Sequence, residues 1–199
     1  MPSTQTNAGF YVVLIPAYKP DERLLTLCQA LRTAQLAVLV VDDGSGVSFA
    51  PLFTQVVVQG VPVVRHAVNL GKGRALKTGI NEALQRYPHL AGLITADADG
   101  QHTPTDILRI IDAMRAHPDA LVTGARTFAG AVPFRSRAGN IITRNVYHFV
   151  TGIRCQDTQT GLRGIPACAL ASMIKLSGEG YEFEMTMLLK LRDLRLPLF

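Results

Sequence analysis

The chain has 199 residues, of which 48% are hydrophobic and 18% are charged, so it can bury a sizeable core and is not a disordered chain. No apolar run approaches the roughly 20 residues that cross a bilayer, residues 1–7 lack the basic and apolar regions of a signal peptide, and three scattered cysteines form neither a disulfide framework nor a zinc cluster. With a net charge of +5, the composition indicates a globular, cytosolic protein.

Short apolar runs alternate with amphipathic patterns along the first two thirds of the chain. Tyr11 to Ile15 is a run that Pro16 stops, which is typical of a buried strand, and Pro20 opens a pattern with helical spacing. We expect further strands at 36–41, at 56–58 with 61–64, at 90–96 and at 121–124, and further helices at 72–87 and from Thr103 and Pro104 onward. Strands that alternate with helices at this spacing predict an α/β fold, with a mainly parallel sheet and helices on both faces.

The pattern changes after Pro133. We expect a helix over 136–150, then a polar loop, and helices over 167–174 and 183–194. No linker or repeat interrupts the chain, so residues 1–199 are predicted to form one domain with a flexible segment at 1–8. The last residues, 196–199, look like the beginning of another strand, and we therefore expect the sequence to be truncated at its C-terminus.

Positive charge is concentrated in one segment. Six arginines lie between Arg126 and Arg163 against the single acid Asp157, a sum of +5 that equals the net charge of the whole chain. Arginine holds phosphate oxygens through paired hydrogen bonds, so the segment suggests an anionic partner, although a solvated basic face has the same composition. Nucleic acid is not expected, because the chain has no Trp and its Tyr and Phe are not interleaved with these arginines as a stacking platform needs.

Four polar clusters follow predicted strands, at 16–18, 42–45, 97–101 and 124–126. Each alone reads as an ordinary turn, since Asp and Gly are common turn residues. Ligands of parallel α/β sheets bind at the carboxyl ends of the strands, however, and all four clusters fall on that one rim. We therefore expect the site there.

Asp97 and Asp99 leave an apolar strand two residues apart. Two carboxylates at that spacing repel each other unless a cation neutralises them, and the Gln101 amide adds another oxygen. Oxygen ligands suit Mg²⁺ or Mn²⁺, and such an ion, when held by few protein groups, usually completes its shell with substrate phosphates. An isolated Asp-x-Asp is a weak signal, but at the end of a buried strand it favours a metal site.

A glycine-rich motif, Asn69 to Arg74, precedes a predicted helix. Its glycines let a backbone approach a ligand, the helix N-terminus offers free N–H groups, and Lys72 and Arg74 add positive charge for a phosphate. The motif is not a nucleotide-triphosphate P-loop, because His66 stands where that motif has its first Gly and Gly73 follows the Lys. The Rossmann glycine fingerprint is also absent after the first strand, so dinucleotide chemistry is not expected.

These motifs together resemble those of the family 2 glycosyltransferases of GT-A fold. The segments that carry the resemblance are 13–18, 41–45, 69–73 and 97–101. Further segments are similar to the polyprenyl-phosphate branch of that family, typified by dolichol-phosphate mannose synthase: 124–126, the helix over 135–145, and 157–163. The match runs from about Tyr11 to the C-terminus.

The resemblance implies a role for each of several residues. It implies donor contacts by Pro16, Ala17, Tyr18, Asp42, Asp43, Gly71, Lys72, Asp97 and Ala98. It implies metal ligation by Asp97, Asp99 and Gln101. It implies an acceptor side, about 126–199, with Arg126, Arg135, Arg137, Asp157 and Arg163 around the acceptor. Catalytic roles fall to Asp99, Arg126 and Arg137.

The implied reaction moves a sugar from a UDP- or GDP-sugar to a polyprenyl phosphate, with Mg²⁺ or Mn²⁺ and with inversion at the anomeric carbon. A phosphate acceptor is close to a dianion near neutral pH, since its second pKa is about 6, so no general base is required, and the sequence offers no obvious His base. A lipid acceptor implies peripheral contact with the cytoplasmic face of a membrane. Lys19 and Pro20 stand where the family often has Asn-Glu, and this departure affects one expected nucleoside contact.

Three alternatives stay open on the sequence alone. A glycosyltransferase that acts on a glycan or small-molecule hydroxyl would need a carboxylate base, which Asp157 or Glu184 could supply. A sugar nucleotidyltransferase is disfavoured, because 16–18 replaces the Gly- and Arg-rich loop that such enzymes normally carry. A non-catalytic nucleotide-sugar-binding remnant would bind the donor with metal and would not turn it over.

Other polar residues have both a structural and a functional interpretation. His102 is either a contact near the acidic motif or an ordinary loop histidine at a helix start. For the acidic run 179–184 we favour a helix start whose acids complement the dipole over a place near the acceptor. Cys28 and Cys168 lie in apolar helical patterns and are expected in the core, and nothing near Cys155 makes it a nucleophile.

Overall fold

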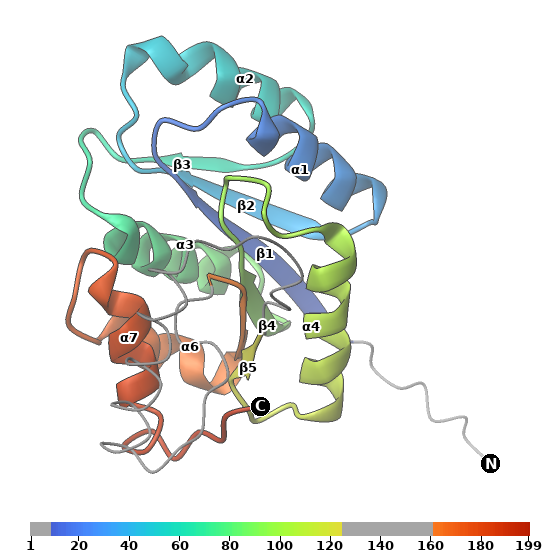
Figure 1. Cartoon of the computed structure of the whole chain (residues 1–199), viewed down its shortest axis with the longest axis vertical. Helices are drawn as coiled ribbons and strands as arrows, with labels where there is room; N and C mark the ends of the chain where they lie inside the picture. Colours follow the sequence, from blue (N-terminus) through green and yellow to red (C-terminus); the bar gives the residue numbers. More distant parts are fainter. Residues whose placement is uncertain (1–8, 125–160) are drawn as a thin grey trace, which may run out of the picture.

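The apolar runs of the chain form one six-stranded sheet in the computed structural model, which describes residues 9–124 and 161–199 (Figure 1). The strands lie in the order β3-β2-β1-β4-β6-β5. Neighbours among β1 to β4 are parallel, and β6 runs antiparallel to both β4 and β5. This confirms the predicted mainly parallel α/β fold. The strands are β1 (Phe10–Ala17), β2 (Ala37–Asp42), β3 (Val63–Arg65), β4 (Leu90–Thr95), β5 (Val122–Thr123) and β6 (Arg163–Pro166).

Helices cover both faces of the sheet (Figure 1). One face carries α1 (Arg23–Thr33), the 3₁₀ turn η1 (Val47–Phe49), α2 (Ala50–Val58) and α4 (Pro104–Ala116). The other face carries α3 (Lys72–Arg86), α6 (Ala167–Ile174) and α7 (Glu182–Leu189). Side chains alternate between the two faces along a strand, so Val13 and Ile15 of β1 join the first core and Leu14 joins the second.

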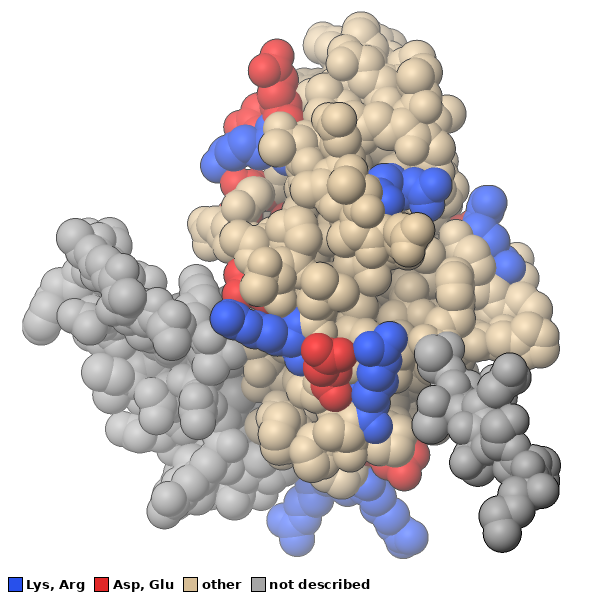
Figure 2. Space-filling view, turned by 90° about the vertical axis from the view of Figure 1, so that its right-hand side faces the viewer, with Lys and Arg blue, Asp and Glu red and all other residues tan. Residues whose placement is uncertain are grey.

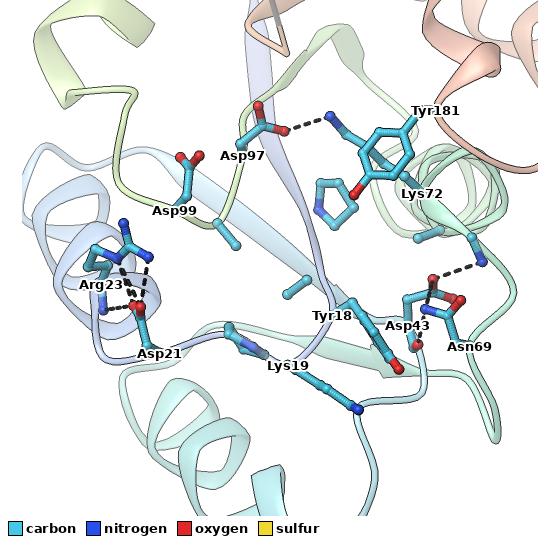
Figure 3. Close-up of a pocket in the computed structure, with 16 residues that line it drawn as sticks. Tyr18, Lys19, Asp21, Arg23, Asp43, Asn69, Lys72, Asp97, Asp99 and Tyr181 are labelled. Carbon is cyan, nitrogen blue, oxygen red and sulfur yellow. Dashed lines mark hydrogen bonds and ion pairs between the residues drawn. The ribbon is translucent and has the colours of Figure 1, made fainter. Parts of the chain in front are cut away.

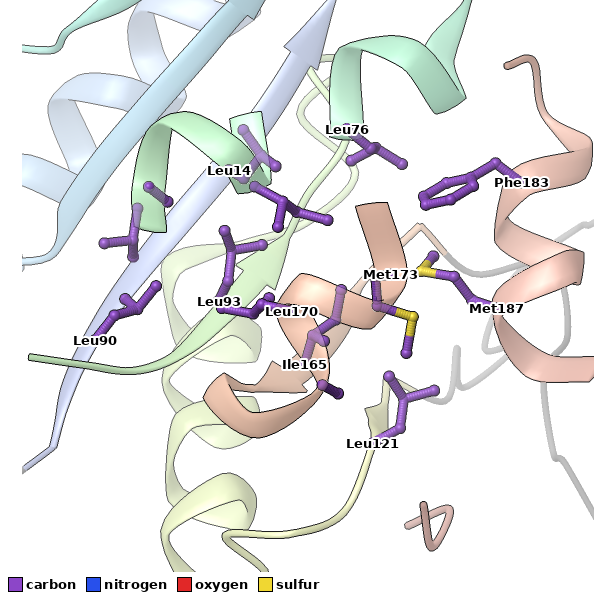
Figure 4. Close-up of a cluster of buried hydrophobic side chains, with 14 of the residues drawn as sticks. Leu14, Leu76, Leu90, Leu93, Leu121, Ile165, Leu170, Met173, Phe183 and Met187 are labelled. Atoms are coloured by element: carbon purple, nitrogen blue, oxygen red, sulfur yellow. The ribbon is translucent and has the colours of Figure 1, made fainter. Parts of the chain in front are cut away.

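The core beneath α3, α6 and α7 joins segments that are far apart in the sequence (Figure 4). Leu14 and Leu93 of the sheet, Leu76 of α3, Met173 of α6 and Phe183 of α7 are each at most 1% exposed. Burying a side chain of this size contributes about 1.5–3 kcal/mol. The part of the chain after residue 160 is therefore held to the N-terminal half by a shared apolar core.

Two elements differ from the sequence-based expectation. Residues 56–58 were expected in a strand but end helix α2, where only Phe53 and Val56 are fully buried and Val58 is 82% exposed. Pro51 near the start of α2 favours a helix. The buried Phe53 and Val56 are three residues apart, as on one face of a helix, and this spacing outweighs the preference of the three valines 56–58 for a strand. Strand β6 was expected to be loop, because its Gly and Pro are common turn residues. The last helix is also shorter than expected and ends at Leu189.

The chain end pairs with the edge of the sheet. Leu198 forms a parallel β-bridge with Leu121, and the amides of Leu121 and Phe199 donate to the carbonyls of Pro197 and Leu121, each at 2.8 Å. The prediction that 196–199 has the character of a strand is thus confirmed at Leu198, which pairs with the sheet edge. None of the helices described here has the length and apolar character that spanning a membrane requires.

Candidate active site

The carboxyl ends of β1, β2 and β4 surround a pocket of about 590 Å³ (Figure 3). Parallel strands bring these ends to one edge of the sheet, where α/β proteins bind their ligands. The pocket is lined by Pro16, Ala17, Tyr18, Lys19, Pro20, Asp21, Arg23, Asp43, Asn69, Gly71, Lys72, Ala75, Asp97, Ala98, Asp99 and Tyr181. The fold therefore brings together most of the residues predicted for the donor and the metal.

Asp42 and Gln101 are two predicted site residues that do not line this pocket. Asp42 is buried, and its Oδ1 accepts the amide of Ser45 at 2.9 Å, which shapes the turn after β2. Gln101 is exposed, and its backbone amide donates to Asp99 Oδ1 at 3.0 Å. The structure thus gives both residues a local role and does not place their side chains as nucleoside contact or metal ligand.

Asp43 lines the pocket, but its carboxylate is held by the loop that follows β3. Its Oδ1 accepts the amide of Leu70 at 2.9 Å and lies 2.7 Å from Nδ1 of His66. Its Oδ2 accepts the amide of Gly71 and the Nδ2 group of Asn69, both at 2.9 Å. Four hydrogen bonds to the Asp43 carboxylate fix this loop against the end of β2. A substrate that contacts Asp43 therefore has to share carboxylate oxygens that already accept hydrogen bonds from the protein.

Another segment of the chain closes the start of α3. The amide of Gly73 donates to the carbonyl of Gly180 at 3.1 Å, and the amide of Arg74 donates to that of Glu179 at 2.9 Å. A Cβ at Gly71 would lie 2.4 Å from the Glu179 carbonyl oxygen, and a Cβ at Gly73 would lie 2.8 Å from the Glu179 carbonyl carbon. The prediction that the helix start offers free N–H groups to a phosphate is therefore wrong for these two amides. The glycines serve close packing within the chain.

Lys72 is a partly buried cation that faces the pocket (Figure 3). Its Nζ lies 2.7 Å from Asp97 Oδ1 and 2.9 Å from Glu184 Oε2, and its side chain is 16% exposed. Burial lowers the pKa of Lys72, but the charges of Glu184 and Asp97 outweigh burial and raise the pKa above its ordinary value. Lys72 therefore carries a positive charge between two acids.

Asp97 is contacted at both oxygens. Lys72 lies at Oδ1, and Nε2 of His102 lies 3.5 Å from Oδ2. Burial alone would raise the pKa of Asp97, but the contact with His102 and the charge of Lys72 lower it well below its usual value. His102 is only 6% exposed, which favours the interpretation as a contact near the acidic motif. A Cβ at Gly161 would lie 2.2 Å from Oδ2, so only glycine allows the backbone to pass this carboxylate.

Asp99 is the less restrained of the two acids. The amide of Gln101 is its hydrogen-bond donor among the residues described here. Two carboxylates that line one pocket provide the oxygen ligands that Mg²⁺ or Mn²⁺ prefers. Within residues 9–124 and 161–199 no group of three or more His, Cys, Asp or Glu side chains is placed to hold a metal. Two carboxylates are thus compatible with a divalent ion only if that ion obtains further ligands from a bound molecule or water.

Arg163, predicted to contact the acceptor, is fully buried in β6. Its guanidinium donates to the backbone carbonyl of Glu184. In the paired strand β4, the Thr95 hydroxyl donates to the Gly161 carbonyl at 2.7 Å. Arg163 thus connects β6 to the first turn of α7, and the structure shows this side chain inside the protein rather than in the pocket.

Arg126, Arg135, Arg137 and Asp157 lie outside the described residues, as do the predicted helix over 136–150 and Cys155. Gly124 packs on Leu162 and does not line the pocket. On the face that Figure 2 shows, the basic and acidic side chains of the described residues are interspersed. The described residues on this face therefore form no separate cluster of basic side chains that could take the place of the segment 126–163.

The sequence-based interpretation of the acidic run 179–184 was incomplete. Glu182 and Glu184 do lie in the first turn of α7, as expected. Glu184 also contacts Lys72, and the Tyr181 ring lies 5.8 Å from the same ammonium. Arg23 at the start of α1 is another pocket residue that the sequence patterns did not indicate. The available signal for the acidic run was that two aromatic residues and two acids alternate after Gly180, which is more than a helix start needs.

The two described cysteines have different environments. Cys28 is buried in the core, as expected, and burial raises the pKa of its thiol to about 12. Cys168 is exposed, so the expectation that it lies in the core is wrong. The apolar pattern of α6 buries Ala169, Leu170 and Met173, which leaves position 168 on the outer side of the helix.

Comparison with known sequences gives one family and several relatives. The model of a family described as Glycosyl transferase family 2 matches residues 12–175. An uncharacterized protein of Methanocaldococcus jannaschii is 31% identical over 185 residues, which cover 89% of this chain and 74% of that protein. The UDP-N-acetylglucosamine–dolichyl-phosphate N-acetylglucosaminyltransferase of Methanococcus voltae is 26% identical over 79% of this chain and 70% of its own length. The polyprenol monophosphomannose synthase of Mycolicibacterium smegmatis is 29% identical over 81% of this chain and 63% of its own.

Among solved structures, the chain is similar to glucosyl-3-phosphoglycerate synthase from Mycobacterium tuberculosis in complex with Mn²⁺, UDP and glucosyl-3-phosphoglycerate. The TM-score is 0.70 at 14% sequence identity, over 96% of this chain and 69% of that one. A second structure of that synthase, with Mg²⁺ and UDP, gives a TM-score of 0.69 at 15% identity, over 96% of this chain and 68% of that one. At such low identity the likeness concerns the fold, and it agrees with the predicted GT-A architecture.

Proposed function

Because the chain belongs to glycosyl transferase family 2, we propose that it moves a sugar from a nucleoside diphosphate sugar to a polyprenyl phosphate. The observation that carries this proposal is the pocket at the carboxyl edge of the sheet, which Asp97, Asp99 and Lys72 all line and in which the Lys72 ammonium contacts Asp97. Acids and a lysine side by side suit a divalent ion and a diphosphate bound together. Relatives whose names include a dolichyl-phosphate acceptor or a polyprenol monophosphomannose product support the acceptor class.

The donor would bind along the part of the pocket that begins at the end of β1. Pro16, Ala17 and Tyr18 would contact the nucleoside, with Ala98 as a further apolar contact. Tyr18 is 49% exposed and presents a ring on which a base or ribose can pack. Lys72 would hold an oxygen of the diphosphate, and Gly71 keeps the backbone before it close to the loop that Asp43 fixes.

Asp97 and Asp99 would hold Mg²⁺ or Mn²⁺, which as a Lewis acid stabilises the negative charge of the leaving diphosphate. His102 would orient Asp97 from the side opposite Lys72, because the two groups contact different oxygens of that carboxylate. The ammonium of Lys72 would add a second positive charge near the same diphosphate.

The acceptor phosphate would be bound by Arg126, Arg135 and Arg137, with Asp157 in the same segment. Guanidinium groups orient a phosphate that has the same sign of charge as the donor. Such a phosphate attacks without a general base, because it is already largely a dianion above its second pKa of about 6. Direct displacement then inverts the anomeric carbon. In this proposal Arg163 supports the acceptor side from within, through its contact with Glu184.

A transfer assay tests the proposal. Purified protein would be incubated with undecaprenyl phosphate and labelled UDP- or GDP-sugars, with Mn²⁺ or with EDTA. We expect a lipid-linked sugar phosphate with either the UDP-sugar or the GDP-sugar, but not with both, and no product in EDTA. Asp99→Asn should lower kcat by at least about 100-fold. Asp112→Asn, at an exposed position of α4, is the matched control and should keep the wild-type rate.

Other outcomes of the same assay would contradict the proposal. Transfer to a glycan or small-molecule hydroxyl but not to lipid phosphate, together with its loss in Asp157→Asn, would show a hydroxyl-directed enzyme. Metal-dependent nucleotide binding with no transfer to any acceptor would show a binding protein.

A lipid acceptor brings the pocket to a membrane surface, and we propose peripheral contact with the cytoplasmic face. Val68, Leu70 and Tyr181 are 61%, 46% and 79% exposed and lie at or beside pocket residues, so they would contribute apolar contacts. Cosedimentation with vesicles tests this idea. We expect binding that weakens when both Val68 and Leu70 are changed to Ser, and equal binding of this variant would contradict it.

A further inference from the structure

Lys72 contacts two acids that come from different parts of the fold. Asp97 follows β4, and Glu184 lies in the first turn of α7, 112 residues after Lys72. The ammonium is 2.7 Å from one carboxylate and 2.9 Å from the other. The side chains of Lys72 and Glu184 are only 16% and 12% exposed, so water screens this pair weakly.

The three groups carry two negative charges and one positive charge. In the described part of the chain, the second oxygen of Glu184, Oε1, is buried without a hydrogen-bond partner. Glu184 therefore has capacity to bind the ammonium more fully than it does here. Asp97, in contrast, has the ammonium of Lys72 2.7 Å from Oδ1, while Nε2 of His102 lies 3.5 Å from Oδ2, at the limit of a hydrogen bond.

A divalent ion at Asp97 and Asp99 would repel the ammonium of Lys72. Without a second acid, Lys72 would then be a buried cation with no compensating charge, which is costly. Glu184 removes this cost, because the ammonium can keep one carboxylate when it loses the other.

We propose that Lys72 acts as a resident cation that neutralises Asp97 in the metal-free protein, and that Glu184 is the positioning residue that retains the Lys72 ammonium when a divalent ion takes Asp97. This inference rests on the metal site of the proposed function. The exchange leaves Lys72 in the pocket, where it can bind a donor phosphate beside the ion.

The backbone around Glu184 is held firmly, so the lysine side chain is the part that moves. The carbonyls of Glu179 and Gly180 accept the first amides of α3, and Arg163 donates to the carbonyl of Glu184 itself. The Lys72 side chain is a flexible stem of four carbons, so small rotations about its bonds shift the ammonium between two carboxylates that it already contacts.

The test is the affinity for Mn²⁺, measured by the paramagnetic signal of the free ion, first with Mn²⁺ alone and then with UDP present. Lys72→Met removes the competing cation, so we expect Mn²⁺ alone to bind about tenfold more tightly than to wild type. Glu184→Gln removes the alternative partner of Lys72, so the ammonium stays on Asp97 and Mn²⁺ binds about three- to tenfold more weakly. In EDTA, Lys72→Met should also have a lower Tm, and Mn²⁺ should raise its Tm more than that of wild type.

Lys77 and Glu179 provide a matched control. They are the same pair of residue types, come from α3 and the segment before α7, and lie 3.0 Å apart, but neither contacts Asp97. If only the general charge of this region matters, Lys77→Met and Glu179→Gln will shift the affinity in the same way as the test variants. We expect each control variant to change it by less than about twofold.

The double variant decides whether Glu184 acts through Lys72. In the Lys72→Met background, Glu184→Gln should change the Mn²⁺ affinity by less than about twofold. An equal loss in both backgrounds would show that Glu184 attracts or binds the ion directly, and it would overturn the inference. Should Lys72→Met fail to fold, Lys72→Gln takes its place, since an amide can donate to either carboxylate.

Failure of the inference is separable from failure of the proposed function. A wild-type protein that binds no Mn²⁺, with or without UDP, would overturn the metal site and the inference together. Normal Mn²⁺ binding with unchanged affinity in both single variants would overturn the inference alone, and the transfer assay would still stand.

Discussion

The two acids of the Asp97–Asp99 motif differ in what surrounds them, although the sequence presents them as equivalent. Asp97 forms an ion pair with Lys72, lies 3.5 Å from Nε2 of the buried His102 and packs against Gly161. Asp99 is held by one backbone amide, that of Gln101. A carboxylate with two charged or polar partners contributes to folding, whereas one that is restrained by a single turn amide is available for a ligand.

The first prediction concerns the stability of variants at these two positions. In EDTA, Asp97→Asn should lower the free energy of unfolding by about 1.5–3 kcal/mol, the range for a hydrogen bond to a charged group. Asp99→Asn should change it by no more than about 0.5 kcal/mol. Urea unfolding followed by circular dichroism measures both values, and equal losses would contradict the different environments described here.

The second prediction concerns thiol reactivity. Because burial raises the pKa of Cys28 to about 12, its thiol stays protonated at about pH 8 and, being buried, is also inaccessible. Cys168 is exposed, so it should react with a thiol reagent under native conditions while Cys28 does not, up to about pH 9. Mass spectrometry of the labelled peptides identifies the sites, and labelling in urea, where both should react, is the control. Native labelling of Cys28 at the rate of Cys168 would contradict the prediction.

At the scale of elements, the junction between α3 and the segment before α7 lies beside the pocket, to which it contributes Lys72 and Tyr181. The amides of Gly73 and Arg74 donate to the carbonyls of Gly180 and Glu179, and the Arg74 and Lys77 side chains pair with the Glu179 carboxylate. A helix N-terminus bonded in this way has lost part of its capacity to bind an anion. Within residues 9–124 and 161–199, the proposed positive charge for a phosphate at this helix start comes from the Lys72 side chain rather than from the amides of Gly73 and Arg74.

The third prediction tests this junction. Alanine favours a helix over glycine by about 0.8–1 kcal/mol, so helix propensity alone predicts that Gly73→Ala stabilises the protein. The new Cβ would lie 2.6 Å from Phe183 Cβ and 2.8 Å from the Glu179 carbonyl carbon, and overpacking of this kind costs about 1–3 kcal/mol. We expect a net loss of stability in urea unfolding.

Asn81→Ala, at an exposed position of the same helix, is the matched control. It should be neutral or stabilising by up to about 0.5 kcal/mol. A stabilising Gly73→Ala would show that the junction is looser than described.

At the scale of the whole molecule, the sheet is completed by segments from both ends of the chain. β6 lies between β4 and β5, and the residues after Leu196 pair with Leu121 and with Thr123 of β5. Phe199 also stacks on His117, which follows α4, at 3.9 Å between ring centroids. This arrangement holds the edge strand, which has only two residues, in the sheet.

The fourth prediction is that deletion of residues 197–199 destabilises the protein. It removes three backbone hydrogen bonds to Leu121 and Thr123, each of which contributes about 0.5–1.5 kcal/mol, for a total of about 1.5–4.5 kcal/mol. Phe199→Ala, which keeps these backbone bonds and loses only the ring, should cost less. Thermal unfolding compares the variants, and an unchanged Tm for the deletion would show that the pairing does not contribute to stability.

The sequence alone was sufficient for features that depend on residues close together in the chain. The apolar runs of β1, β2 and β4, the Thr103 cap with Pro104 behind it, and the place of the acidic motif after a buried strand were all predicted. Hydrophobic spacing and capping act within a few residues, so their signals are local. Parallel strands then bring their carboxyl ends to one edge, which places most of the residues predicted for the donor and the metal in one pocket.

Only the tertiary structure decided which distant groups meet inside that pocket. Lys72 contacts Glu184 across 112 residues of sequence, the first amides of α3 are bonded to carbonyls at 179 and 180, and Arg163 is buried. β6 is a strand because it has β4 and β5 beside it, while 56–58 is helical because α2 packs on the sheet. Such contacts depend on how whole elements pack and on which partners are left for each polar group, and spacing along the chain does not encode either.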